Sequence, residues 1–317
     1  MAVKSAIPEA ARGKWPKLLE HFGVSCKRKR HGPCPICGGK DRFIFDDKEG
    51  MGTFHCNHCG AGTGFTLLSK VKGWSMSQTM REVAKVAGGF ERMETKPEMT
   101  DAERKKALND LWKGARASTN GDPVQRYIAQ RTGLLTVPDA IRFHPELYHP
   151  ETRSSHAGMI AKITSPDHLP VSIHRTFLTP TGEKAQISRS KMLMPGPIPD
   201  GSAIRLFTFT DTLGIAEGIE TAISCFALFG IPTWAAVSAA LLVKWEPPET
   251  VQKVYIFGDN DQSFTGQLAA YRLGWRLRNN SKYEIVRVMI PDVTGADWND
   301  ILTIHGTQNA KELYKLK

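Results

Sequence analysis

Residues 34–60 read CPICGGKDRFIFDDKEGMGTFHCNHCG, and this stretch decides the fold of the N-terminal part of the chain. It contains two Cys-x-x-Cys pairs with the spacing C-x2-C-x18-C-x2-C. Each pair forms a tight turn that aims two sulfurs at one ion, and two such turns complete a tetrahedral site. The spacing therefore predicts a structural zinc ribbon with the ligands Cys34, Cys37, Cys56 and Cys59.

Four further side chains close to these pairs could also bind a metal ion: Cys26, His31, His55 and His58. We interpret them as bystanders, because four thiolates already fill the coordination sphere of zinc. A Cys3His site that uses one of them is the alternative. Since four protein ligands leave no open position for water or substrate, the predicted zinc is structural in either case.

The stretches DRFIFDD and GTFHC between the cysteine pairs alternate as two strands of a hairpin. This alternation places three aromatic side chains within reach of one face: Phe43, Phe45 and Phe54. Aromatic side chains on a small basic sheet can stack on single-stranded bases. They can equally form the core of a domain that is too small to have another, and both interpretations stay open.

The chain is basic, with 42 Lys and Arg residues against 32 Asp and Glu residues and a formal net charge of +10. Residues 1–60 contain 11 Lys and Arg against six Asp and Glu, so half of the excess charge lies there. A balance of this kind favours a polyanionic partner. We expect the run before the first cysteine pair to bind DNA phosphates: Lys27, Arg28, Lys29 and Arg30.

The sequence indicates a cytoplasmic protein without a membrane span. The N-terminus has no apolar stretch that resembles a signal peptide, and five of the six cysteines lie before residue 60, as expected for a metal site in a reducing compartment. The uncharged run 221–243 approaches the length of a membrane span. Because Gly230 and Pro232 interrupt it, we expect a helix, a turn, a buried strand and the start of another helix.

The pattern of helices and strands predicts four parts. Residues 1–90 are the zinc-ribbon domain, and residues 91–121 are a charged helical linker. Residues 122–205 combine one helix with short β runs, whereas strands alternate with helices in residues 206–317. Such alternation predicts a parallel sheet covered by helices. The expected fold class is α/β, with an N-terminal zinc ribbon, a mixed α+β middle subdomain and a C-terminal parallel-sheet domain.

Acidic residues follow three predicted strands of the C-terminal part. Glu217 ends the stretch LGIAE, Asp259 and Asp261 follow the strand VYIF, and Asp297 and Asp300 lie in DWND after a third strand. Because the carboxyl ends of parallel strands meet at one edge of a sheet, we expect these groups to converge. Each could instead cap a helix, most plausibly Asp297 and Asp300. Gathered carboxylates favour a divalent cation, and oxygen ligands select Mg²⁺ or Mn²⁺.

The motifs EGIETA, FGDND and DWND, in this order and spacing, resemble the Toprim domain, a Rossmann-like domain shared by bacterial-type primases, topoisomerases and some nucleases. The cysteine stretch resembles the zinc ribbon that opens phage and plasmid primases and primase-helicases. The stretches VSIHRTFLTPTGEKA and KMLMPG resemble the segment that joins the two modules in primases of mobile elements. The resemblance therefore covers nearly the whole chain.

The resemblance implies roles for the acidic residues. Glu217 matches the Toprim glutamate for proton transfer or metal organisation, Asp259 and Asp261 match the metal ligands of the DxD motif, and Asp297 matches the last acidic motif. The chain departs from the pattern at two positions. Thr221 stands where many Toprim primases have an aspartate, and Ala296 stands where related sequences often have a lysine.

These observations predict a DNA primase that makes short RNA primers on single-stranded DNA from ribonucleoside triphosphates. We expect a basic groove for template or triphosphate, although its members could also form a solvated loop: His174, Arg175, Lys184, Arg189 and Lys191. No GxxxxGK[ST] motif occurs in the sequence, so a separate helicase partner is expected. The alternatives are a metal-dependent nuclease and a non-catalytic accessory protein that binds single-stranded DNA.

Overall fold

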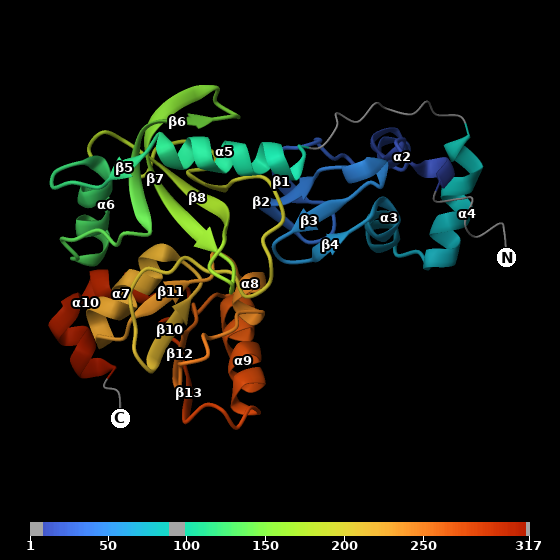
Figure 1. Ribbon diagram of the computed structural model, residues 1–317. Coiled ribbons are helices and arrows are strands. Elements are labelled where there is room, and N and C mark those ends of the chain that lie inside the picture. The colour runs from blue at the N-terminus through green and yellow to red at the C-terminus, as the bar shows by residue number, and fades with distance from the viewer. Residues whose placement is uncertain (1–8, 89–98, 315–317) are drawn as a thin grey trace. The chain divides into compact units, whose positions relative to one another are not determined.

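The computed structural model describes residues 9–88 and 99–314 and divides the chain into two compact units, residues 1–98 and 99–317. The predicted boundary between residues 90 and 91 lies outside the described residues, and the four-part division stays a prediction. The predicted fold class is confirmed, with a zinc ribbon, a mixed middle region and a C-terminal parallel sheet (Figure 1). Within the described ranges no helix is long and apolar enough to cross a membrane.

The first unit is built on a four-stranded antiparallel sheet with the order β1-β2-β3-β4. Its elements are α2 (Trp15–His21), β1 (His31–Cys34), β2 (Gly38–Phe45), η1 (Lys48–Gly50), β3 (Phe54–Cys56), β4 (Gly60–Gly62), α3 (Gly64–Lys72) and α4 (Met76–Ala87). The predicted hairpin is formed by β2 and β3, which pair Phe45 with Phe54. Helix α4 follows α3 after the ribbon, and its cap Ser75 accepts a hydrogen bond from the Gln78 amide.

The core of the first unit contains the three phenylalanines of the hairpin. Phe43, Phe45 and Phe54 are each at most 3% exposed and pack with the helices that follow and precede the ribbon. Phe43 and Phe54 stack with a distance of 5.6 Å between ring centroids. These rings therefore form the core and do not offer faces to nucleic-acid bases.

The second unit begins with an antiparallel sheet with the order β5-β6-β7-β8-β9. Its elements are α5 (Asp101–Lys113), β5 (Arg116–Ala117), α6 (Pro123–Thr132), β6 (Ile141–His149), β7 (Ser154–Thr164), β8 (Pro170–Leu178) and β9 (Lys191–Leu193). Helix α6 starts at Pro123, where Asp122 accepts hydrogen bonds from the amides of Val124 and Gln125. This helix and the last two strands bring basic side chains toward the following sheet.

The C-terminal sheet is parallel throughout, with the order β11-β10-β12-β13. Its elements are β10 (Thr212–Ala216), α7 (Ile219–Phe229), β11 (Thr233–Ala235), α8 (Ala239–Val243), β12 (Lys253–Phe257), α9 (Thr265–Arg278), β13 (Ile285–Met289) and α10 (Trp298–Leu313). Helices α7 and α10 pack together on one face, and α8 and α9 cover the other (Figure 1). The uncharged run 221–243 is, as predicted, part of a buried helix, a strand and the next helix.

The two sheets of the second unit share one hydrophobic core. Residues from α6 and β7 pack with residues from α7, α10 and the end of β12 in a single cluster. Ile204 also forms a β-bridge with Ala235 of β11. Because one core holds both sheets, side chains of the middle region are positioned over the carboxyl ends of the parallel strands.

We predict that Gly64→Ala destabilises the first unit. Trp15 is 1% exposed, and a Cβ atom at Gly64 would lie 2.1 Å from the indole ring, so the ring would have to shift. Overpacking of this kind costs about 1–3 kcal/mol. The measurement is the temperature at which the full chain releases zinc, followed with a zinc-sensitive dye. Gly88→Ala is the control, because its Cβ would meet no atom within 4 Å; equal release temperatures for both variants would contradict the prediction.

Candidate active site and zinc site

The predicted zinc ligands converge in the first unit. The sulfur atoms of Cys34, Cys37, Cys56 and Cys59 all lie within 4.8 Å of one another. The Sγ–Sγ distances are 4.0 Å between Cys34 and Cys59 and 3.7 Å between Cys37 and Cys56. A tetrahedron with Zn–S bonds of about 2.3 Å has edges of about 3.8 Å, so the four thiols fit a zinc ion.

Backbone amides support the same arrangement. The amide of Ile36 donates to Cys34 Sγ, and the amides of His58 and Cys59 donate to Cys56 Sγ, each at 3.4 Å. Such bonds stabilise the negative charge of a bound thiolate. In the described part of the chain, no histidine belongs to this cluster of metal-binding atoms.

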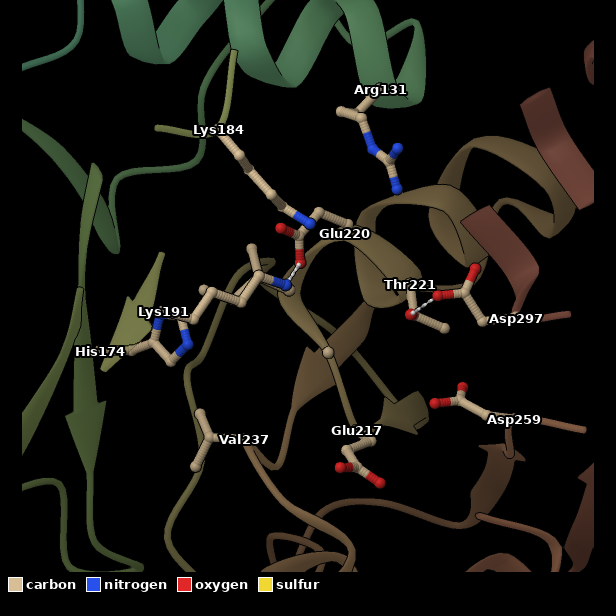
Figure 2. Close-up of a pocket in the computed structure, with 12 residues that line it drawn as sticks. Arg131, His174, Lys184, Lys191, Glu217, Glu220, Thr221, Val237, Asp259 and Asp297 are labelled. Carbon is tan, nitrogen blue, oxygen red and sulfur yellow. Dashed lines mark hydrogen bonds and ion pairs between the residues drawn. The ribbon is translucent and has the colours of Figure 1, made fainter. Parts of the chain in front are cut away.

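The second unit contains a pocket of about 250 Å³ at the carboxyl ends of β10 and β12. Four acidic side chains line it: Glu217, Glu220, Asp259 and Asp297. Four basic or imidazole side chains complete the lining: Arg131, His174, Lys184 and Lys191. Figure 2 shows Glu217, Asp259 and Asp297 on one side of the pocket, and the nitrogen-bearing side chains on the other.

Asp259 is a pocket carboxyl group whose surroundings oppose its ionisation. Its Oδ1 atom is buried and has no hydrogen-bond partner among the described residues. Burial, followed by the charges of Glu217 and Asp297, raises the pKa of Asp259 to about 8. A buried carboxylate oxygen without a donor, beside two further carboxyl groups, is the environment that a bound cation stabilises. The residues present therefore fit a divalent metal ion.

The other two acidic groups of this side are held by their local structure. Glu217 follows β10, and its pKa is raised by burial and then by the charge of Asp261. Asp297 precedes α10 and caps it, because its Oδ1 accepts a hydrogen bond from the Asp300 amide at 2.8 Å. The other oxygen of Asp297 accepts a hydrogen bond from the Thr221 hydroxyl at 3.3 Å (Figure 2). One aspartate thus serves both as a cap and as a pocket side chain.

Asp261 and Asp300 lie beside the pocket and do not line it. Asp261 Oδ2 accepts a hydrogen bond from the Gly266 amide at 2.9 Å, at the start of α9. Asp300 Oδ2 accepts one from the Asp297 amide at 3.1 Å. Among the described residues, only the four cysteines form a group of three or more Cys, His, Asp or Glu ligand atoms within 4.8 Å of one another. The acidic group is therefore more open than the zinc site.

The opposite side of the pocket contains an ion pair between a buried carboxylate and an exposed lysine. Lys191 Nζ lies 2.8 Å from Glu220 Oε2, and the Tyr127 hydroxyl donates to the other oxygen of Glu220. Although burial opposes ionisation, Lys191 and the Tyr127 hydroxyl hold the pKa of Glu220 well below its usual range. Glu220 is 4% exposed, and it therefore fixes Lys191 at the pocket wall as a charged pair.

Three nitrogen-bearing groups of the pocket lack protein partners. The guanidinium of Arg131 and the ammonium of Lys184 have no hydrogen bond or ion pair with any residue that the structure describes. Burial, then the charge of Lys191, lowers the pKa of Lys184. Burial also lowers the pKa of His174 to about 4, so its imidazole is neutral at pH 7, and its buried Nδ1 has no partner. These groups are available to an anionic ligand.

Several predicted binding residues lie elsewhere. Arg175 is buried and donates to the Leu193 carbonyl at 3.1 Å, and Arg189 pairs with Glu151 at 3.1 Å. In the first unit, Lys27, Lys29 and Arg30 are exposed. Arg28 instead lies 3.8 Å from the buried carboxylate of Asp47, which accepts a hydrogen bond from the Gly52 amide. Arg28 therefore stabilises the ribbon as the partner of a buried charge.

Arg131 and Tyr127 were not singled out from the sequence. Both lie on α6, far before the acidic motifs in the chain, and their helix has no motif that marks them as site residues. Glu220 stands next to Thr221 in the motif EGIETA and was given no role from the sequence. Its role depends on Lys191 and Tyr127, which only the tertiary structure brings together.

Family models match most of the chain in three segments. Residues 29–65 match the zinc-binding domain of primase-helicase, and residues 212–308 match the Toprim domain. The chain combines a primase-type zinc ribbon with a Toprim domain. Between them, residues 102–206 match a domain of unknown function (DUF7146). The Toprim domain thus begins at β10 and contains Glu217, Asp259 and Asp297.

Solved primase structures resemble the chain at low identity. The zinc-binding and RNA polymerase domains of Aquifex aeolicus primase are 15% identical with a TM-score of 0.39, covering 97% of this chain and 84% of that one. The primase fragment of the bacteriophage T7 primase-helicase is 12% identical with a TM-score of 0.41, covering 89% and 98%. A DnaG primase catalytic domain bound to ssDNA is 14% identical with a TM-score of 0.40, covering 67% and 83%.

We predict that the purified chain binds one zinc ion and that Cys56→Ser loses it. Cys56 is buried and accepts two amide hydrogen bonds, so a hydroxyl cannot replace its thiolate in the site. The measurement is the zinc content by atomic emission, together with circular dichroism of the ribbon. Cys225→Ser is the control, because Cys225 lies in the core of the second unit. Full zinc content in the Cys56 variant would implicate Cys26, His55 or His58 as a ligand.

We predict that Asp259→Asn stabilises the metal-free protein at pH 8. With a folded pKa of about 8 and an unfolded value of about 3.9, the folded state binds more protons between these two values. Stability conferred by protonated Asp259 is therefore lost as the pH rises from about 4 to about 8. The variant removes this loss, and its Tm at pH 8 rises by about 2–4 °C for each kcal/mol recovered.

The control for this experiment is Asp139→Asn, an exposed aspartate outside the pocket. Added Mg²⁺ should raise the Tm of the wild-type protein at pH 8 and have little effect on the Asp259 variant, because the cation replaces the proton. A lower Tm of Asp259→Asn at pH 8, without metal, would contradict the assignment of Asp259 as a destabilised carboxylate.

Proposed function

We propose that the protein is a DNA primase that joins ribonucleotides on a single-stranded DNA template by metal-dependent nucleotidyl transfer. The observation that carries this proposal is the composition of one pocket. It joins a destabilised carboxylate, Asp259, with the unpartnered cations of Arg131 and Lys184. A divalent ion on the carboxylates and cations on the opposite wall together match a nucleoside triphosphate, which carries both metal-binding and free phosphate oxygens.

The carboxylates are the proposed metal ligands. Glu217, Asp259 and Asp297 would hold Mg²⁺ or Mn²⁺, with Asp261 adding negative charge beside Glu217. The bound metal supplies charge neutralisation for the phosphates and lowers the pKa of the attacking 3′-hydroxyl. In the reaction the 3′-oxygen forms a bond to the α-phosphorus of the incoming nucleotide, the hydroxyl proton leaves, and the bond to pyrophosphate breaks.

The opposite wall is the proposed phosphate-binding side. Arg131 and Lys184 donate to phosphate oxygens, and Lys191 adds a charge whose position is set by Glu220. His174 is neutral at pH 7 and offers a hydrogen bond without a charge. Arg131 has the phosphate-binding role that the sequence predicted for Arg175 and Arg189. The guanidinium groups of those two residues instead contact other groups of the middle region.

The zinc ribbon is the proposed contact to the DNA template. Lys27, Lys29 and Arg30 are exposed on this unit, whereas its phenylalanines are buried, so binding there depends on phosphate contacts. We further propose that the protein acts in the cytoplasm in the replication of a plasmid, phage or other mobile element. A separate helicase would open the duplex.

The test is primer synthesis by the full chain with single-stranded DNA, ribonucleotides and Mg²⁺ or Mn²⁺. Wild-type protein should produce short RNA, and Asp259→Ala should lower the rate about 100-fold or more, because a metal ligand is lost. Asp139→Ala is the matched control and should retain the wild-type rate, since Asp139 is exposed and outside the pocket. Products should be resolved on a denaturing gel.

Other outcomes would replace the proposal by a specific alternative. Degradation of DNA by the wild type in the absence of nucleotides, lost in Asp259→Ala, would identify a nuclease. Tight binding of single-stranded DNA without any metal-dependent product would identify an accessory protein. Equal RNA synthesis by wild type and Asp259→Ala would place the chemistry outside this pocket.

A further inference from the structure

Helix α9 presents an exposed apolar stripe outside the pocket. Leu268, Tyr271 and Trp275 are spaced three and four residues apart, so they follow one face of the helix, and Phe264 is the N-cap residue directly before it. Trp275 is 74% exposed, Phe264 71%, Tyr271 58% and Leu268 50%. Large side chains gathered on one helix face at such exposure mark an interaction surface.

The stripe adjoins a groove at the edge of the parallel sheet. Tyr271, Trp275 and Arg278 of α9 line it on one side, and Val286 and Val288 of β13 line it on the other. β13 is an edge strand that pairs only with β12 among the described strands, and Figure 1 shows α9 running along the sheet above it. The α9–β13 face is defined here as this groove together with the stripe.

The charge around this face decides between possible occupants. Residues 265–290 contain five basic residues and one acidic residue: Arg272, Arg276, Arg278, Lys282 and Arg287 against Glu284. Arg276 is bound to Glu246, whereas Arg272 and Arg278 are exposed. A second copy of the chain would bring like charges together, which is unfavourable. A polyanion is complementary to the face.

We propose that the α9–β13 face binds single-stranded nucleic acid. Exposed aromatic rings stack on bases of any sequence, and adjacent arginines contact the phosphates, which is how sequence-tolerant single-strand binding works. The stripe begins at Phe264, three residues after Asp261, so a strand that lies along α9 ends beside the acidic side of the pocket. This contact is separate from the pocket and does not depend on its chemistry.

The test measures binding of a fluorescein-labelled 15-nucleotide oligo-dT to the full chain by anisotropy, without added divalent ions. Trp275→Ala should weaken binding roughly five- to tenfold, as expected for the loss of one base–aromatic stack. Trp275→Phe should retain most of the affinity, whereas Trp275→Leu should lose as much as the alanine variant, because leucine is apolar but cannot stack. Ile304→Ala, an exposed apolar residue on α10, is the control.

The arginines are tested by the salt dependence of the same binding. Arg272→Ala and Arg278→Ala should each reduce the slope of log K against log salt by about 0.7, the value for one phosphate contact on a single strand. Trp275→Ala should leave the Tm nearly unchanged, because the side chain is mostly exposed.

Two outcomes would overturn the proposal. Unchanged oligo-dT affinity in Trp275→Ala and Trp275→Leu would show that Trp275 does not stack on bases. Loss of a concentration-dependent dimer in these variants by sedimentation, with unchanged affinity for oligo-dT, would assign the face to a second copy. Asp259→Ala should still bind oligo-dT, so a failure of primer synthesis and a failure of this face are distinguishable.

Discussion

Half-buried carboxyl groups that face one another raise the free energy of the folded chain, and the Toprim domain places three of them around one space. Burial opposes the ionisation of Asp259, and the charges of Glu217 and Asp297 oppose it further. The backbone holds these groups in place regardless, because each follows a strand or begins a helix in the hydrophobic core. Trp298 packs against Phe229 and Phe257 directly behind the acidic motifs. The core therefore supplies the stability that the site removes, as is common at functional sites.

The Lys191–Glu220 pair determines what faces the carboxylates. Glu220 lies on α7 of the parallel domain, whereas Lys191 and Tyr127 come from the middle region. Separating the buried Glu220 carboxylate from its two partners is costly. These contacts therefore specify how the middle sheet lies over the strand ends. The same contact uses the negative charge of Glu220, and Arg131 and Lys184 have no partner for their side-chain charges among residues 9–88 and 99–314. The pocket therefore keeps a basic wall beside an acidic one.

The N-terminal unit is a small domain whose interior contains both metal ligands and aromatic side chains. A domain of this size has little apolar surface to bury, so four thiolates and three phenylalanines share its interior. Because those rings are buried, the proposed binding of DNA by the ribbon rests on its exposed cations. Three exposed aromatic residues lie instead at α9, with Phe264 at its N-cap and Tyr271 and Trp275 on the helix, where the stability of the sheet does not depend on them.

Local patterns in the sequence determined the zinc ribbon, the alternation of strands and helices and the position of each acidic motif. Cysteine spacing and hydrophobic period express constraints between near neighbours, and the structure bears them out for β2, β3 and all four strands of the parallel sheet. The tertiary structure alone decided which charges meet. Arg28 pairs with Asp47, Arg175 turns to a backbone carbonyl, and Arg131 reaches the pocket. Those outcomes depend on the packing of elements far apart in the chain, and electrostatic energy depends on distance in space, which no local period encodes.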